Sequence, residues 1–202
     1  MRFIVSRYNH DMEWIKEYAT PEEITLYDRS ETPLEGSIVV PNLGSDWFDK
    51  FSFICDNYDN LPDVAVYTKA NLFKYISKEE FDLVKDNKEF TPLLTLKHAT
   101  YGSNGVETCF YQGGMYYEIN NFWYLGAHPV RDETAIKELS DMLGITQLSY
   151  VPFAPGSSYI LPKETIRKHP KVFYEKLRWY LSWDRYPGEA MIIERGMLTA
   201  WL

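Results

Sequence analysis

Polar side chains follow three segments of the sequence that have the apolar composition of buried strands. They are Ser6, Arg7 and Tyr8 after the first segment, Asp28 and Arg29 after the second, and Lys69 and Asn71 after the third. Ligands of open α/β sheets bind beyond the carboxyl ends of the strands. The sequence therefore predicts a crevice in which Arg7, Arg29 and Lys69 attract an anionic ligand. Asp28 would accept hydrogen bonds from a base or a ribose. The alternative is a solvated Asp28-Arg29 turn and a surface Arg7.

Two further residues could do chemistry outside these strand ends. His128 lies in a loop between Gly126 and Pro129, where it could contact a phosphate or a metal, although a plain loop histidine is the alternative. Glu194 follows apolar residues in a predicted final helix, where burial could make it a base; an ion pair with Arg195 is the alternative. The motifs of P-loop, dinucleotide-binding, zinc-protease and α/β-hydrolase sites are absent.

The elements that must position these residues alternate between strand and helix. Apolar and β-branched runs predict strands at 2–6, 24–27 and 63–68, and helical spacing predicts helices at 11–18 and 45–57. The second half predicts strands at 149–153 and 159–161, helices at 132–143, 163–169, 172–183 and 189–202, and a loop or irregular hairpin at 100–114. This order favours one α/β domain over residues 1–202, with a central, mostly parallel mixed sheet flanked by helices.

The composition limits which classes of partner and which cellular compartment are expected. The 202 residues carry 21 Lys and Arg against 29 Asp and Glu, a net charge of −8, which argues against duplex nucleic acid. Aromatic residues make up 16%, enough for stacking on sugars or bases or for an aromatic core. Two cysteines, no signal peptide and no membrane span predict a cytoplasmic protein. The apolar end at 200–202 is compatible with a further domain or a docked terminus.

Ordered motifs across nearly the whole chain are similar to those of a known family. The first half carries Arg7-Tyr8-Asn9-His10-Asp11 with Trp14, then Pro41-Asn42-Leu43-Gly44, then Asn57-Tyr58-Asp59-Asn60-Leu61-Pro62. These are similar to the family's R-Y-N-E-D…W, N-x-G-R-E and E-N-Y-D-x-L-P. The second half carries Phe153-Ala154-Pro155-Gly156-Ser157-Ser158-Tyr159, His169-Pro170-Lys171-Val172-Phe173-Tyr174 and Glu194-Arg195. These are similar to F-x-P-G-A-Q-F, H-P-x-x-F-Y-x-x-L and E-R-L. Together the motifs resemble those of a glycosyltransferase-like family of fungi and large DNA viruses.

The resemblance implies a GT-A-type nucleotide-sugar fold and transfer of a hexose or deoxyhexose from a nucleoside diphosphate, with a UDP-sugar favoured, to a glycan or glycoprotein. A virus-encoded member would decorate a structural glycoprotein. Ser6, Arg7, Tyr8, Asp28 and Arg29 would bind the nucleotide, and Lys69 and Asn71 the diphosphate. Gly156, Ser157 and His128 would lie near the sugar, and Glu194, Asp63 and Asp132 are the candidates for the catalytic carboxylate.

Two departures from the family pattern bear on this expectation. Lys69-Ala70-Asn71 stands where GT-A enzymes usually place D-x-D, whose carboxylates hold Mn²⁺ or Mg²⁺. A lysine could neutralise the diphosphate in place of the metal, and Asn71 could still give one oxygen to a cation. Ser45-Asp46 replaces the family's Arg-Glu. The alternative function is therefore a non-catalytic module that binds a carbohydrate or a nucleotide sugar; a nucleotidyltransferase is disfavoured.

Overall fold

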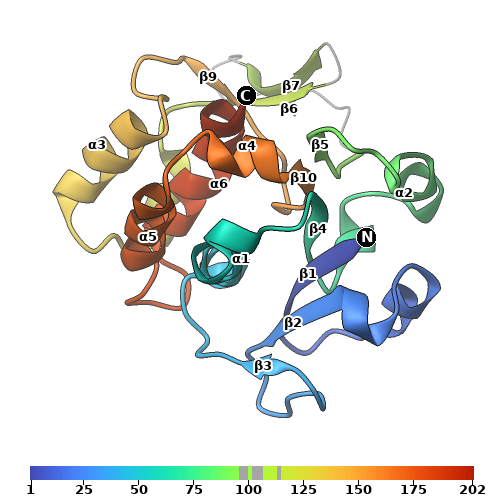
Figure 1. Cartoon of the computed structure of the whole chain (residues 1–202). Helices are drawn as coiled ribbons and strands as arrows, with labels where there is room; N and C mark the ends of the chain where they lie inside the picture. Colours follow the sequence, from blue (N-terminus) through green and yellow to red (C-terminus); the bar gives the residue numbers. More distant parts are fainter. Residues whose placement is uncertain (96–99, 102–106, 113–114) are drawn as a thin grey trace.

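The computed structural model describes residues 1–95, 100–101, 107–112 and 115–202, and its centre is a mixed sheet (Figure 1). Within the described part, this sheet has the strand order β3-β2-β1-β4-β10-β5. Its strands are β1 (Arg2–Arg7), β2 (Ile24–Asp28), β3 (Ile38–Val39), β4 (Val64–Lys69), β5 (Thr91–Pro92) and β10 (Tyr159–Pro162). The first four strands run parallel, whereas β10 runs antiparallel to β4 and β5. The predicted α/β class and mixed sheet are confirmed.

The register of the parallel strands brings their carboxyl ends to one edge. Arg7 of β1 is paired with Asp28 of β2, and Ser6 of β1 with Lys69 of β4. Strand β2 lies on one side of β1, and β4 lies on the other. The direction in which successive strands are added to the sheet therefore reverses at β1. In open α/β sheets such a reversal is where ligands bind.

Alternate side chains of the central strands β1, β4 and β10 enter two different cores, as the two-residue period of a strand requires. Ile4 and Tyr67 belong to the larger core, whereas Phe3, Val5 and Val66 belong to the smaller one. The larger core also takes side chains from α1 (Ser45–Asp56), α4 (Lys163–Arg167), α5 (Lys171–Tyr180) and α6 (Gly188–Trp201). The smaller core takes side chains from η1 (Glu13–Glu17), η4 (Leu72–Lys74) and α2 (Lys78–Val84). Helices therefore cover both faces of the sheet (Figure 1).

A second, antiparallel sheet was not expected from the sequence. It comprises β6 (Thr100–Tyr101), β7 (Glu107–Gln112), β8 (Met115–Ile119) and β9 (Tyr150–Pro152), and α6 packs against β9. The hairpin foreseen at 100–114 lies partly outside the described residues. Strand β8 was missed because Glu118 occupies one of its inward positions, where an apolar residue would signal a strand. Arg195 pairs with this buried carboxylate from α6, and its guanidinium lies 3.9 Å from the centroid of the Tyr124 ring.

Most of the other expected elements form with small shifts at their ends. Residues 132–143 form α3 (Glu133–Met142), which packs against α6, and Pro170 separates α4 from α5 as predicted. The segment at 11–18 forms the 3-10 helix η1 rather than an α-helix. Pro21 disfavours helical backbone in the residue before it, and Thr20 is accordingly extended (φ −78°, ψ 160°). The helix at 13–17 therefore cannot continue through this segment. Three further 3-10 turns are η2 (Pro21–Glu23), η3 (Tyr58–Asn60) and η5 (Trp123–Ala127).

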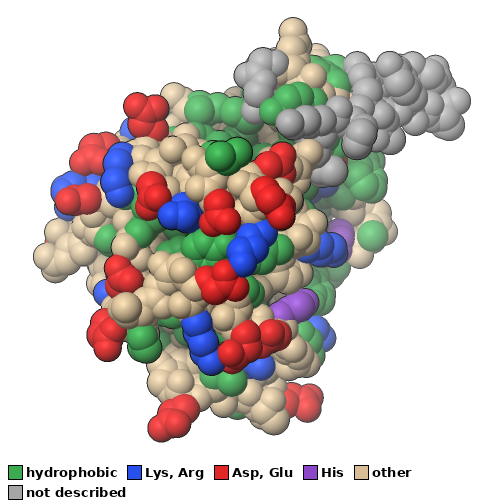
Figure 2. Space-filling model, turned by 90° about the vertical axis from the view of Figure 1, so that its right-hand side faces the viewer, with side chains coloured by type: hydrophobic (Ala, Val, Ile, Leu, Met, Phe, Trp, Pro, Cys, Tyr) green, Lys and Arg blue, Asp and Glu red, His purple; other side chains and the backbone are tan. Residues whose placement is uncertain are grey.

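The molecular surface has mixed charge on the face that carries α2. Figure 2 shows acidic and basic side chains interspersed there with apolar ones. The excess of acidic residues is therefore not gathered into one patch on this face. Among the described residues, no helix has both the length and the apolar character needed to cross a bilayer.

Candidate functional site

A pocket of about 250 Å³ lies at the carboxyl ends of β1, β2 and β4, where the strand order reverses. Seven residues expected at a site line it: Ser6, Arg7, Tyr8, Arg29, Lys69, Asn71 and Glu194. The structure thus brings together polar groups from three strand ends with one carboxylate from α6. The prediction that these strand ends share one crevice agrees with this arrangement.

The remaining lining residues were not singled out as site residues from the sequence. They are His10, Asn42, Ser45, Asp46, Trp47, Tyr186 and Met191. Asp46 was noted only as a departure from the family motif, yet it is the most connected group in the pocket. The signal that could have found it is its spacing from Lys50. An Asp and a Lys four residues apart share one face of a helix, and here that face is buried.

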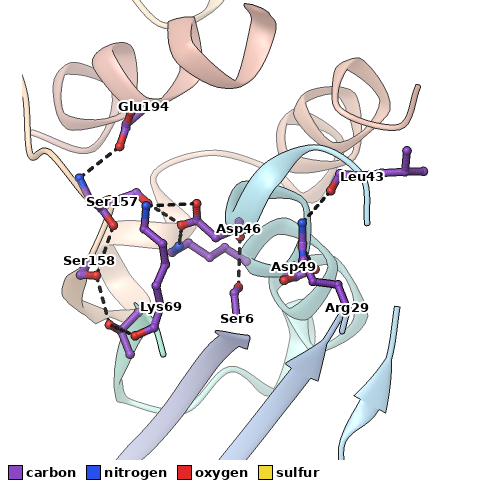
Figure 3. Close-up of polar contacts among 12 residues, drawn as sticks. Ser6, Arg29, Leu43, Asp46, Asp49, Lys69, Ser157, Ser158 and Glu194 are labelled. Atoms are coloured by element: carbon purple, nitrogen blue, oxygen red, sulfur yellow. Dashed lines mark hydrogen bonds and ion pairs between the residues drawn. The ribbon is translucent and has the colours of Figure 1, made fainter. Parts of the chain in front are cut away.

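Asp46 holds two lysines and a serine around one carboxylate (Figure 3). Lys50 contacts Oδ2 from the next turn of α1, and Ser157 donates its hydroxyl to the same oxygen. Nζ of Lys69 lies 3.6 Å from Oδ1. Asp46 is 9% exposed, so these partners, rather than water, stabilise its charge.

The ionisation of this cluster follows from burial and mutual charge. Burial by itself would raise the pKa of Asp46, but Lys50 and Lys69 outweigh it and hold the pKa well below its usual range. Burial lowers the pKa of Lys50, in part offset by the Asp46 carboxylate. For Lys69 burial acts in the same direction, but Asp46 and Glu194 outweigh it and raise the pKa. The pocket therefore contains an ionised carboxylate and a firmly protonated Lys69.

Glu194 reaches the pocket from α6. Its Oε1 accepts the backbone N–H of Gly156 at 3.1 Å, and its Oε2 lies 3.8 Å from a guanidinium nitrogen of Arg195. Burial raises the pKa of Glu194, and the positive charges of Lys69 and Arg195 only partly oppose this. A carboxylate with a raised pKa at a pocket wall can accept a proton. Its alternative role, an ion pair with Arg195, is weak here because Glu118 is the closer partner of that arginine.

Asp28 has a different role from the one expected. Its side chain is fully buried and accepts hydrogen bonds from the backbone N–H groups of Ser30 (2.9 Å) and Leu34 (3.0 Å) and from Arg7 (2.7 Å). It does not line the pocket, so it is not available to a base or a ribose. Asp28 instead orients Arg7, whose guanidinium also donates to the Ser30 hydroxyl at 2.9 Å and to the His10 carbonyl at 2.9 Å.

Arg29 is tied to α1 in a similar way. Its guanidinium lies 2.5 Å from the buried carboxylate of Asp49 and donates to the Leu43 carbonyl at 3.0 Å. Burial raises the pKa of Asp49, and the guanidinium opposes this. Arg29 therefore joins the end of β2 to the helix whose first turn lines the pocket.

The first turn of α1 is placed by the segment between α5 and α6. Gly44 precedes the helix with a positive φ of 60° and donates its N–H to the Asp184 carbonyl at 2.8 Å. The N–H of Ser45 donates to the Arg185 carbonyl at 3.2 Å. The positive end of the α1 dipole thereby faces the pocket, which favours negative charge in the ligand.

Two tyrosines line the pocket near Arg185. The guanidinium of Arg185 lies 4.9 Å from the ring centroids of both Tyr8 and Tyr186. His128 does not line the pocket, but its Nδ1 lies 3.3 Å from the Tyr186 carbonyl. Its place is therefore behind this part of the wall rather than at a phosphate.

The remaining predicted site residues fall into two groups. Gly156 and Ser157 do not line the pocket, but they contact Glu194 and Asp46, which do. Asp63 lies at the amino end of β4, exposed and paired with Lys163, and Asp132 caps α3 by accepting the N–H of Thr134 at 2.9 Å. Neither Asp63 nor Asp132 lines the pocket, so Glu194 is the candidate catalytic carboxylate that we retain.

The cations and carboxylates that are paired at and beside the pocket balance in number. The set comprises four cations and four carboxylates: Arg7, Arg29, Lys50 and Lys69, and Asp28, Asp46, Asp49 and Glu194. In the part of the chain that the structure describes, no three His, Cys, Asp or Glu residues form a metal-ligand group. Asp46 already contacts two ammonium groups, so its carboxylate is not free to share a cation with Asn71.

Comparison with known proteins identifies a family but no characterised relative. The profile of a family described as a protein of unknown function (DUF3431) matches residues 3–195. Neither the curated proteins nor the solved structures contain a match to this sequence. The matched range includes every residue that lines the pocket. The chain therefore belongs to the DUF3431 family.

Proposed function

We propose that this protein is a glycosyltransferase with a GT-A-type fold, which transfers a sugar from a nucleoside diphosphate sugar to a glycan or glycoprotein. The observation that carries the proposal is the position of Lys69. Its ammonium group stands at the carboxyl end of β4, beside Asp46 and at the reversal of the strand order. The resemblance of the ordered motifs to a glycosyltransferase-like family also supports it.

The diphosphate would be held by positive charge from the protein. Lys69 is a quarter exposed and can meet a phosphate, and the amino end of α1 favours the same charge. Arg7 and Arg29 line the pocket, but Asp28 and Asp49 neutralise most of their charge, so Lys69 is the principal cation for the diphosphate. Stabilising the departing diphosphate is the main electrostatic requirement of sugar transfer.

Glu194 is the group that we propose as the base for the acceptor hydroxyl. It lines the pocket with Lys69, and its pKa is raised by burial. Such a shift brings a carboxylate nearer the pH at which it can both be ionised and accept a proton. The hydrogen bond from Gly156 fixes one of its oxygens, and the other has a 3.8 Å contact with Arg195 as its competitor for the acceptor hydroxyl.

The size of the pocket limits what it can enclose. Its volume of about 250 Å³ is below the range of roughly 300–1,000 Å³ typical for drug-sized ligands. A nucleotide sugar would therefore fill it with one part and extend past Tyr8 and Tyr186 with the rest. We propose a UDP-sugar as the donor.

The test is binding and hydrolysis of a panel of nucleotide sugars. A donor at one hundred times its Kd should stabilise the native state by about 2.7 kcal/mol, seen as a raised Tm. Release of the nucleoside diphosphate should be lost in Lys69→Met and retained in Lys163→Met. Lys163 is a matched control because it forms an ion pair with Asp63 at the opposite end of β4. No Tm shift with any nucleotide sugar at millimolar concentration would contradict the proposal.

A non-catalytic binding module is the second candidate. It is favoured by Lys69-Ala70-Asn71 in place of D-x-D and by the balanced charges of the pocket. A module of this kind would give the Tm shift without any release of nucleoside diphosphate. The pair of assays therefore separates the two functions.

A further inference from the structure

The two lysines that contact Asp46 differ in their access to the pocket. Lys50 is 1% exposed and contacts Oδ2 from within α1. The Lys69 side chain is 25% exposed and lines the pocket. Its Nζ lies 3.6 Å from Oδ1, longer than the roughly 2.7–2.9 Å of a charge-assisted hydrogen bond. Lys69 is thus the accessible and loosely held cation, and Lys50 is the inaccessible one.

This difference decides which lysine can leave the carboxylate. A buried carboxylate that loses its only cation is strongly destabilised, so a single lysine would remain bound to it. Here Asp46 would still have Lys50 and the Ser157 hydroxyl if Lys69 moved away. Lys50 is buried beside Trp47, with its ammonium 5.3 Å from that ring, and it does not line the pocket, so a ligand there cannot draw it away from Asp46.

We propose that Lys50 is a resident counterion for Asp46 that releases Lys69 to bind the phosphate groups of an anionic ligand. Lys69 exchanges Asp46 for the ligand, and Lys50 keeps the buried carboxylate neutralised during the exchange. Lys50 is therefore a positioning residue that acts through Asp46 and Lys69. The identity of the natural ligand rests on the proposed function, but the exchange itself concerns any diphosphate-like anion.

The surroundings of Asp46 fit such an exchange. Ser157 holds Oδ2, and the hydroxyl of Ser6 donates to the backbone carbonyl of Asp46 at 3.4 Å, so the carboxylate stays in place. Lys69 has a second favourable neighbour in the Tyr75 ring, whose centroid lies 5.3 Å from Nζ. Glu194 also lines the pocket and attracts the same ammonium. The lysine can therefore move within the pocket without losing all its partners.

The test uses inorganic pyrophosphate as the probe, with binding to the full chain measured by calorimetry. Lys69→Met should weaken binding by about tenfold to a hundredfold, because it removes the ligand's cation. Lys50→Met should weaken it to a similar extent although Lys69 is still present, because Lys69 must then remain with Asp46. Lys163→Met, at the other end of β4, should bind like the wild type.

The decisive variant is the double substitution Lys50→Met with Asp46→Asn. Removing the carboxylate frees Lys69 again, so pyrophosphate affinity should return to within about threefold of the wild type. A purely structural role of Lys50 predicts no such rescue. Wild-type affinity in Lys50→Met, or no rescue in a double variant whose circular dichroism and Tm show that it is folded, would overturn the proposal.

A second measurement needs only the wild type, in case a variant does not fold. In protein labelled with ¹³C at the lysine Cε, pyrophosphate should shift the Lys69 signal and leave the Lys50 signal unchanged. A shift of Lys50, or no pyrophosphate binding at millimolar concentration, would overturn the exchange. Pyrophosphate binding with the expected pattern but without hydrolysis of any nucleotide sugar would leave the exchange intact and contradict the glycosyltransferase.

Discussion

The Arg29 guanidinium lies 2.5 Å from the Asp49 carboxylate, and the two side chains are 6% and 0% exposed. Removing one partner of such a buried pair leaves an uncompensated charge. Asp49→Asn should therefore lower the free energy of unfolding by about 3–5 kcal/mol, measured by urea denaturation. Replacing both partners with Arg29→Met and Asp49→Leu should restore most of this loss.

The control for this prediction is an exposed pair. Lys16 and Glu13 form an ion pair whose side chains are both 69% exposed, so Glu13→Gln should change the free energy of unfolding by less than about 1 kcal/mol. Equal losses for Asp49→Asn and Glu13→Gln would show that burial does not set the strength of the Arg29–Asp49 pair.

Asp28 gives a pH dependence of stability. Burial alone would raise its pKa, but hydrogen bonds from Ser30, Leu34 and Arg7 outweigh it and lower the pKa below its ordinary value of 3.8. A carboxylate whose pKa is lower in the folded state stabilises the fold above the unfolded pKa and loses that contribution as pH falls. Wild-type stability should therefore fall below about pH 4, and Asp28→Asn should make this part of the curve less steep, with the remaining slope coming in part from Asp46.

The measurement for Asp28 is urea denaturation at intervals between pH 2 and pH 6. Glu35→Gln, an exposed position in the loop after β2, is the control and should keep the wild-type slope. If Asp28→Asn retained the full acid dependence, the hydrogen bonds to this carboxylate would not be its cause.

Gly44 tests how the start of α1 is fixed. A Cβ at this position would lie 2.5 Å from Cβ of Leu181 and 2.7 Å from its carbonyl oxygen, and its φ is +60°. Gly36 has a φ of +77° but no atom within 4 Å of an added Cβ. Gly36→Ala should thus cost about 1 kcal/mol from backbone strain alone, and Gly44→Ala should cost about 1–3 kcal/mol more by urea denaturation. Equal losses would mean that the contact with Leu181 relaxes freely.

Glu194 should control the rate rather than the binding of the donor. Glu194→Gln should lower kcat for hydrolysis of a nucleotide sugar by about 10²–10⁴, because the base is lost while the shape is kept. The wild-type rate should fall as pH drops through the raised pKa of Glu194, since only the ionised carboxylate accepts a proton. The variant should lack this acid limb.

The other two carboxylates named from the sequence are the matched controls for Glu194. Asp63→Asn and Asp132→Asn should leave kcat within about twofold, because both side chains lie outside the pocket and asparagine preserves the cap on α3. A large loss of kcat in Asp63→Asn or Asp132→Asn, with Glu194→Gln unaffected, would reverse the assignment.

Local sequence patterns predicted most of the helices, the central strands β1, β2 and β4, and the edge of the sheet that carries the pocket. Trp47, Phe51 and Ile54 recur at helical spacing, and their burial in α1 follows from that spacing. Arg7 and Lys69 come directly after apolar runs, so parallel strands had to bring them to the same edge. Both inferences rest on local periodicity and on the chemistry of strand ends, which a single sequence displays.

The pairing of the buried charges depended on tertiary packing between distant parts of the chain. Asp46 meets Ser157, 111 residues away, and Arg195 meets Glu118, 77 residues away. Periodicity shows which face of an element is buried, but it does not show which distant partner satisfies a polar group there. For this reason Asp46 resembled an ordinary residue of a first helical turn and Asp28 resembled a ligand-binding carboxylate. Their roles depend on the groups that surround each carboxylate in the folded chain: Lys50, Lys69 and Ser157 around Asp46, and Arg7 with two backbone N–H groups around Asp28.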